Sequence, residues 1–407
     1  MYLTHLSLTN FRNFARLDID VPRRVILLTG RNAQGKTSLL EAIYFLATFT
    51  SFQTHLERQM VSFLATRQEL AVGRLVADYQ RGRRAHRLEV RLILEPNGVN
   101  GQRLRKEVLL DGVKRPASEV VGHLSAVVFA PQMTAIVEGG PEERRRYLNL
   151  ALAQAIPHYA RALVEYGKVL EQRNALLKLL AERGGDASQL DVWDQALAQP
   201  GAELLARRME AVQELETFAA RIHRQLTRET EVLRLLYLPS YDPFPPPPGQ
   251  LAMPLATPVR RAGLDTEQIR QGFLQRLQQT RAEDIARGVT TCGPHRDEVR
   301  FLANSIDLGH YGSRGQVRTA LLSLKLAELE WIQAKTNHCP LLLFDEALAE
   351  LDAQRRADLL AYLNRVEQAF LTTAEPNAFA TGFATEAAIW TVDSGTIRTA
   401  AAEDKTL

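Results

Sequence analysis

The chain has 407 residues and a mass of 45.6 kDa, of which 45% are hydrophobic and 24% charged. This composition is typical of a folded protein with two or three domains, and it excludes small disulfide-stapled, collagen-like and disordered classes. The formal net charge of +3 is too small to indicate a nucleic-acid partner by itself. No apolar run approaches the ~20 residues of a membrane-spanning helix, and no signal-peptide pattern opens the chain. We therefore expect a cytoplasmic protein with no membrane partner.

Strand and helix patterns alternate over the first 50 residues. Leu6 and Leu8 alternate with polar residues, an apolar run at 25–28 predicts a strand, and an amphipathic stretch at 37–45 predicts a helix. Alternating segments from about residue 69 to 110 carry turn signals and predict an antiparallel β insertion.

Charge is concentrated in this predicted β insertion. Residues 74–115 contain eleven basic and five acidic side chains, a local excess of six positive charges. A duplex phosphate backbone could use that excess, or the segment could present a solvated β-rich surface, and the sequence leaves both interpretations open.

Residues from about 142 to 236 have long helical periodicity with interleaved charges. The pattern predicts a helical arm that breaks once, at Gly184 and Gly185. The proline-rich segment from Pro239 to Gly249 cannot continue a helix and predicts an extended connector, most simply a plain linker.

The α/β pattern returns after Gly288. A long helix is predicted from Gly315 to about Ala334, with strands at 341–344 and 369–372. The two cysteines, Cys292 and Cys339, lack CxxC spacing and a histidine cluster, so we expect buried thiols rather than a disulfide or a zinc site.

One glycine-rich segment fits the pattern G-x-x-x-x-G-K-[ST] in full, after a predicted strand and before a predicted helix. Backbone N–H groups of such a loop surround phosphate oxygens. Lys36 should bridge the β- and γ-phosphates, and the Thr37 hydroxyl should reach Mg²⁺. The motif predicts a site for ATP with Mg²⁺, built from Gly30, Arg31, Asn32, Ala33, Gln34, Gly35, Lys36 and Thr37.

A P-loop needs a second acid, and Asp345 and Glu346 end the apolar run at 341–344. Asp345 would hold the Mg²⁺ shell, and Glu346 would orient or deprotonate the attacking water. The alternative is that two acids simply end a buried strand. Gln132, after a predicted strand at 126–129, is a further candidate Mg²⁺ ligand, with an ordinary exposed loop glutamine as the alternative.

Ser313, Gly315 and Gln316 stand directly before the predicted long helix. A serine there can be a plain N-cap. In this order, S-x-G-Q ahead of a strand that ends in two acids resembles the signature motif of ABC-type ATPases. In those proteins the signature of one subunit closes over the ATP held by the P-loop of the other, and Asp352 lies where they carry a D-loop along the dimer seam. The resemblance implies a homodimer that forms on ATP binding.

Taken together, the motifs resemble the RecF family over nearly the whole chain. The similar segments are the opening strand at 6–14, Asn32 in the P-loop, the run Arg144-Arg145-Arg146 and the distinctive Gly-Pro-His-Arg-Asp at 293–297.

The resemblance implies an α/β fold, an ABC-type P-loop ATPase head split by a β-sheet subdomain and a helical arm. We expect an N-terminal ATPase lobe at 1–140, an arm with its connector at 141–285, and a C-terminal lobe at 286–407 that packs with the first. The implied function is recombinational DNA repair: dimerisation on ATP at double-stranded or gapped DNA, recombinase loading with the partners RecR and RecO, and slow, DNA-stimulated ATP hydrolysis that resets the dimer.

Four positions depart from the family pattern, and Glu346 should still serve as a base. They are Glu346 for an aspartate, Ala349 for a D-loop serine, Gln53 for an arginine and Met133 for an acid. The alternative function is a structural chromosome-organising head similar to the SMC proteins. The predicted arm is short and lacks sustained heptads, which favours the repair ATPase.

Overall fold

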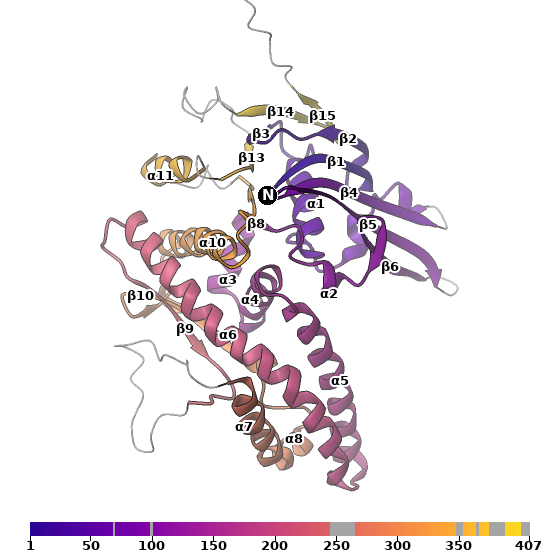
Figure 1. Ribbon diagram of the computed structural model, residues 1–407, viewed down its shortest axis with the longest axis vertical. Coiled ribbons are helices and arrows are strands. Elements are labelled where there is room, and N and C mark those ends of the chain that lie inside the picture. The colour runs from indigo at the N-terminus through magenta and orange to yellow at the C-terminus, as the bar shows by residue number, and fades with distance from the viewer. Residues whose placement is uncertain are drawn as a thin grey trace, which may run out of the picture. The chain divides into compact units, whose positions relative to one another are not determined.

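A computed structural model describes residues 1–67, 70–97, 101–244, 265–346, 353–363, 366–373 and 387–399 (Figure 1). The chain forms two compact units, which we call unit 1 (Met1–Gln132 with Ile332–Leu407) and unit 2 (Met133–Trp331). The three-part division at 1–140, 141–285 and 286–407 stays a prediction.

The first sheet of unit 1 is six-stranded, in the order β15-β14-β3-β13-β12-β8. All neighbours pair in parallel except β15, which is antiparallel to β14. Its strands are β3 (Val25–Thr29), β8 (Ala126–Phe129), β12 (Leu341–Phe344), β13 (Ala369–Thr373), β14 (Ala388–Asp393) and β15 (Thr396–Thr399). The continuously apolar strands β8 and β12 are wholly buried, as expected for parallel strands covered on both faces. The strands predicted at 25–28, 126–129, 341–344 and 369–372 are confirmed.

The second sheet of unit 1 is antiparallel, in the order β2-β1-β4-β5-β6-β7. Its strands are β1 (Tyr2–Phe11), β2 (Phe14–Asp20), β4 (Ala71–Arg81), β5 (Arg84–Asn97), β6 (Gly101–Leu110) and β7 (Val113–Arg115). The predicted antiparallel segments are present, but they do not form a sheet of their own. Because β4 pairs with β1 along most of its length, the N-terminal hairpin and the predicted insertion share one sheet.

Helix α1 (Lys36–Thr48) packs against strands of both sheets of unit 1 (Figure 1). Nearly all of its residues are buried, which explains why its sequence is apolar on most faces. Short segments complete the described part of the unit: η1 (Glu57–Met60), η2 (Ala65–Arg67), α2 (Ala117–Val120), η3 (Pro131–Thr134, which continues into unit 2) and α11 (Ala353–Leu363).

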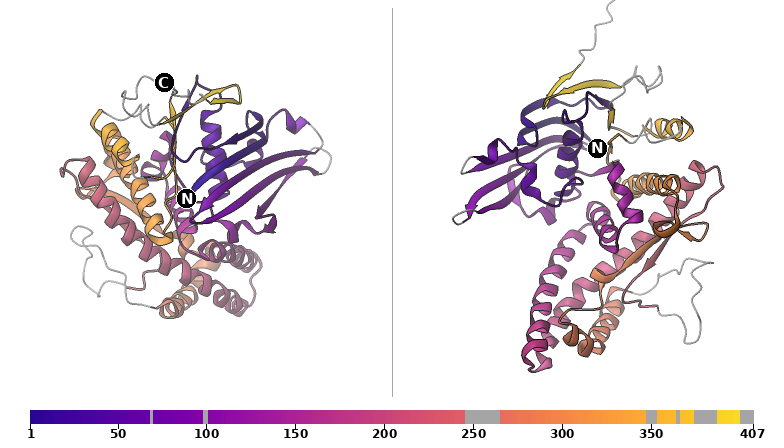
Figure 2. Two further views of the ribbon diagram at one scale, coloured as in Figure 1. Left: turned by 45° about the horizontal axis from the view of Figure 1, so that its top comes forward. Right: turned by 180° about the vertical axis from the view of Figure 1, so that it is seen from behind.

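Unit 2 contains the helical arm, in which α5 (Tyr159–Arg183) and α6 (Leu190–Leu226) lie side by side (Figure 2). The predicted break at Gly184 and Gly185 is confirmed, because α5 ends there in a left-handed glycine. The prediction that the arm breaks only once was wrong. The helical segment is also interrupted between α4 (Pro141–Ala155) and α5, where His158 has φ 67°. The remaining helical segments are α3 (Ala135–Glu138), η4 (Ala187–Gln189), α7 (Thr266–Gln279), α8 (Arg281–Arg287), η5 (Pro294–Arg296), α9 (Leu308–Tyr311) and α10 (Arg314–Thr336, whose last turn belongs to unit 1).

The predicted end of the arm near residue 236 was also wrong. Helix α6 stops at Leu226, and β9 (Leu233–Leu238) pairs with β10 (Glu298–Ala303), which pairs in turn with β11 (Ile306–Asp307). Alternate residues of β9 are buried, so its leucines follow a strand period that the sequence analysis took for a helical one. The run of prolines from Pro245 lies outside the described residues.

Both cysteines are buried free thiols, as predicted. Across the described ranges, no helix has the length and apolar character needed to cross a bilayer.

Candidate nucleotide-binding site

The P-loop joins β3 to α1 in unit 1 and depends on two glycines. Gly30 has φ 143° and Gly35 has φ 119°, a region that side chains with a Cβ rarely adopt. A Cβ on Gly30 would lie 2.4 Å from the Val392 carbonyl oxygen, and one on Gly35 would lie 2.6 Å from the Asn13 amide nitrogen. The loop backbone therefore follows this path only with glycine at both positions.

Gln34 ties the loop to segments from both ends of the chain. Its carbonyl oxygen accepts hydrogen bonds from Asn13 Nδ2 at 2.7 Å and from the Gly395 N–H at 3.1 Å. Its side-chain Oε1 accepts from the Ser394 N–H at 2.8 Å. The sequence analysis missed these anchors, and the only local signal was Asn13 within the opening segment at 6–14.

Lys36 is 4% exposed and faces the concave side of the loop. Its Nζ donates to the carbonyl oxygens of Gly30 at 2.8 Å and Arg31 at 3.1 Å, and lies 4.0 Å from Glu346 Oε1. The predicted P-loop cation and the predicted base thus lie beside each other.

The two predicted acids directly follow the carboxyl end of the parallel strand β12, the edge at which open α/β sheets bind ligands. Asp345 is buried, and its Oδ1 accepts from Thr37 Oγ1 at 2.8 Å and Thr372 Oγ1 at 2.9 Å. Burial raises the pKa of Asp345 above its ordinary value, and the two hydroxyl groups oppose that shift. Glu346 is 45% exposed and has φ 49°.

These residues fit a nucleoside triphosphate with a divalent cation. The loop is a cradle that a Cβ would fill, and α1 begins in it with no acidic residue in its first turn, so the helix N-terminus favours an anion. A hydroxyl and a carboxylate, from Thr37 and Asp345, supply the oxygen ligands that Mg²⁺ prefers.

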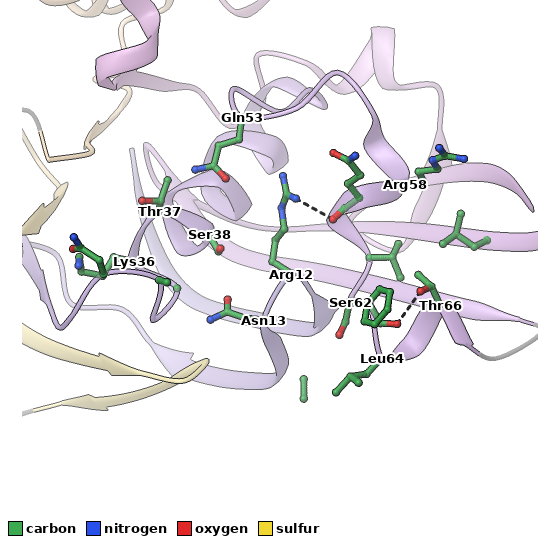
Figure 3. Close-up of a pocket in the computed structure, with 18 of the residues that line it drawn as sticks. Arg12, Asn13, Lys36, Thr37, Ser38, Gln53, Arg58, Ser62, Leu64 and Thr66 are labelled. Carbon is green, nitrogen blue, oxygen red and sulfur yellow. Dashed lines mark hydrogen bonds between the residues drawn. The ribbon is translucent and has the colours of Figure 1, made fainter.

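A pocket of about 1110 Å³ extends from the P-loop towards the segment at 53–67 (Figure 3). Arg12 lines it and donates to the fully buried Glu41 through Nε at 2.7 Å and Nη2 at 2.6 Å. Ser51 also donates to Glu41, so this carboxylate fixes Arg12 and the start of the segment together. Gln53 lines the same pocket and is exposed.

The remaining predicted site residues are not brought to this pocket within unit 1. Gln132 is exposed in η3 and does not line the pocket. Ser313, Gly315 and Gln316 belong to unit 2, where the Ser313 Oγ accepts from the Gln316 N–H at 3.2 Å and the Gln316 Oε1 accepts from the Ser313 N–H at 3.0 Å. This is a capping box at the start of α10. Asp352 and Ala349 lie outside the described residues.

The Gly-Pro-His-Arg-Asp motif forms a buried polar network in unit 2. Asp297 Oδ2 accepts from Arg208 Nη1 at 2.9 Å and from Tyr237 Oη at 2.5 Å. His295 Nδ1 lies 2.7 Å from Tyr166 Oη, and its Nε2 lies 3.0 Å from the Thr290 carbonyl oxygen. The motif therefore joins the arm helices to β9 and β10.

Six of the eleven basic residues in the segment at 74–115 form local ion pairs, and they share carboxylates, so the segment keeps a net positive charge. Arg74, Arg87, Arg91, Arg105, Lys106 and Lys114 each have a carboxylate partner. The exposed basic residues for which the structure gives no such pair are Arg83, Arg84, Arg103 and Arg115. These four residues are therefore the candidates for phosphate contact, and both interpretations of the segment stay open.

The model of the family described as RecF/RecN/SMC N terminal domain matches residues 2–397. A protein of Chloroflexus aggregans named DNA replication and repair protein RecF is 41% identical over 386 residues, which cover 92% of this chain and 93% of the relative. The chain belongs to the RecF family. A solved structure of the recombination mediator protein RecF with ATP, in the RecFOR pathway, is 28% identical, covers 98% of each chain and superposes with a TM-score of 0.81.

The fold of this chain is also similar to that of an SMC head. The Smc head domain of Pyrococcus furiosus, solved with the C-terminal domain of ScpA, has a TM-score of 0.50 at 15% identity, covering 98% of this chain and 96% of that one. At that identity the likeness concerns the fold alone. The predicted architecture, an ABC-type P-loop ATPase head with a helical arm, is confirmed.

Proposed function

We propose that this chain is a DNA replication and repair protein that binds and hydrolyses ATP in unit 1. The observation that carries the proposal is the convergence of Lys36, Thr37, Asp345 and Glu346 at one edge of the parallel sheet. The names of the family relatives support the DNA-repair part of the proposal.

Each side chain has a chemical task that its position supports. Lys36 and the loop N–H groups would hold phosphate oxygens, while Thr37 and Asp345 would hold Mg²⁺, which offsets phosphate charge when bound with ATP. Glu346 lines the pocket with its carboxylate accessible to water, so it can orient a water molecule and accept its proton.

The dimer is the second part of the proposal. Ser313, Gly315 and Gln316 of one copy would close over the nucleotide held by the P-loop of a second copy, with Asp352 along the seam. Weak, DNA-stimulated hydrolysis would then reset the dimer. The signature motif of this chain and its membership of the family support this arrangement.

Double-stranded and gapped DNA are the proposed substrates, with RecR and RecO as protein partners and the cytoplasm as the compartment. The solved relative is described as part of the RecFOR pathway, which supports these partners. Arg83, Arg84, Arg103 and Arg115 are the exposed cations that we propose to test for DNA contact.

A mixing experiment tests the composite site. If Ser313 only caps α10, Ser313→Ala should cost ~1 kcal/mol of stability and leave ATP-dependent dimerisation unchanged. If it closes over the nucleotide of the second copy, the variant should bind ATP as a monomer but fail to dimerise or hydrolyse.

Lys36→Ala has the complementary defect, since it loses the P-loop cation and keeps Ser313. Mixing the two inactive variants creates one intact composite site per heterodimer, so partial recovery of hydrolysis is expected. Normal dimerisation by Ser313→Ala alone would leave Ser313 as a helix cap and exclude the composite site.

A further inference from the structure

Thr372 connects the two acids of the site. It stands near the end of β13 with 2% exposure, and its Oγ1 donates to Asp345 Oδ1 at 2.9 Å. The same oxygen accepts the backbone N–H of Glu346 at 2.8 Å. The Thr372 hydroxyl thus donates its single proton to the Asp345 carboxylate and accepts the backbone N–H of Glu346 with a lone pair.

The bond to Glu346 acts on a strained residue. Glu346 has φ 49°, in the left-handed region that a non-glycine residue occupies only when its surroundings hold it there. The backbone conformation sets the direction of the Cα–Cβ bond, so holding the N–H helps to hold the direction in which the side chain leaves the backbone. Thr372 supplies this constraint from the neighbouring strand.

The bond to Asp345 acts on the orientation of a carboxylate. Its Oδ1 is held between the hydroxyls of Thr37, in the first turn of α1, and Thr372, near the end of β13. Partners that orient a ligating carboxylate tune both metal affinity and activity.

We propose that Thr372 is a positioning residue that sets Asp345 and Glu346 as one unit, so that the Mg²⁺ ligand and the base keep a fixed relation. The inference rests on the proposed ATP hydrolysis. It also assigns a use to a hydroxyl that cannot itself act as a base at neutral pH.

Thr372→Val is the direct test, because valine keeps the β-branched shape that a strand favours and removes only the hydroxyl. We expect kcat to fall about 10–100-fold with KM for ATP changing far less. The Mg²⁺ concentration that half-saturates binding of a fluorescent ATP analogue should rise by a comparable factor, a readout independent of turnover. Thr372→Ser should restore most of both losses.

Thr48→Val is the matched control. Thr48 is also a buried threonine of unit 1 whose hydroxyl donates to a backbone carbonyl, Tyr44 O at 2.9 Å, but it lies about 16 Å along α1 from Thr37. This variant should lose a similar amount of thermal stability and keep its kcat and Mg²⁺ dependence.

The possible outcomes distinguish a failure of the positioning role of Thr372 from a failure of the proposed ATP hydrolysis. Absence of ATP hydrolysis by the wild-type chain would overturn the proposed function. Wild-type hydrolysis together with unchanged kcat and Mg²⁺ dependence in Thr372→Val would overturn the positioning role alone, as would failure of Thr372→Ser to restore them. If Thr372→Val does not fold, the same contrast is measured between Thr372→Ser and Thr372→Ala.

Discussion

The proposed role of Glu346 as the base can be tested by a single substitution. Its carboxylate lines the pocket and its backbone is fixed by Thr372, so Glu346→Gln preserves size and position while removing the base. We expect ATP binding to persist and hydrolysis to slow by ~10²–10⁴-fold. Single-turnover hydrolysis and equilibrium ATP binding, measured on the same preparation, check this. Wild-type turnover in the variant would show that the base is another residue.

For single residues, the sequence predicted which side chains belong to the site better than it predicted which side chains touch each other. The P-loop motif and the acids after an apolar run are local patterns, and the structure places Thr37 and Asp345 in direct contact. The bonds of Gln34 to Asn13 and Ser394, and the pairing of Arg12 with Glu41, join segments far apart in sequence. No spacing rule indicates such pairs, so they appear only once the sheets are assembled.

Among the elements, the turn before β10 is held by a buried ion pair. Arg208 is 2% and Asp297 1% exposed, and the guanidinium also donates to Tyr159 Oη at 3.1 Å. Asp297→Asn would leave the Arg208 charge buried without its counter-ion, which we expect to cost about 3–5 kcal/mol of unfolding free energy. Urea unfolding checks this, with Glu210→Gln, from an exposed pair with Arg207, as the control that should change little. Equal stability of the two variants would contradict the account.

The same turn predicts a pH dependence. Burial lowers the pKa of His295 to about 4, with Arg296 and Arg145 adding to the shift and the Thr290 carbonyl and Asp297 opposing it. Because the unfolded histidine titrates near 6.5, the unfolded state binds more protons between these values. The stabilising contribution is therefore complete above pH 6.5 and is lost, by about 3 kcal/mol, as pH falls to 4.

Unfolding free energies measured from pH 7 to 4 test this dependence. His295→Gln can keep both hydrogen bonds without titrating, so it should remove that part of the slope. An identical slope in this variant would place the pH dependence on other groups.

Helices and strands were predictable where the apolar residues followed a single helical or strand pattern. The parallel strands and α10 follow from apolar runs and a long helical repeat, and their observed bounds lie within a few residues of the predicted ones. The prediction failed at β9, a leucine-rich strand that begins seven residues after the end of α6, and at His158, whose left-handed backbone carries no glycine signal. The prediction of a separate β insertion was wrong for a different reason. Alternation of polar and apolar residues predicts a strand but does not specify its partner, and here β4 pairs with β1.

For the whole molecule, the length of the arm helices bears on which type of ATPase the chain can be. Helix α6 has 37 residues and spans about 55 Å, far from the extended rod of a chromosome-organising head. We therefore propose that the nucleotide drives association of two heads on DNA, and not movement of a long coiled coil.

The most direct test of this claim is the molar mass of the chain by gel filtration with light scattering, with gapped duplex DNA and either ATP, ADP or no nucleotide. We predict a DNA complex that contains two 45.6 kDa chains with ATP, and no such two-chain complex with ADP or without nucleotide. Glu346→Gln should make the ATP complex persist, and Lys36→Ala should abolish it. A single chain per complex in all three conditions, or a dimer that forms equally well without ATP, would rule out ATP-driven dimerisation on DNA.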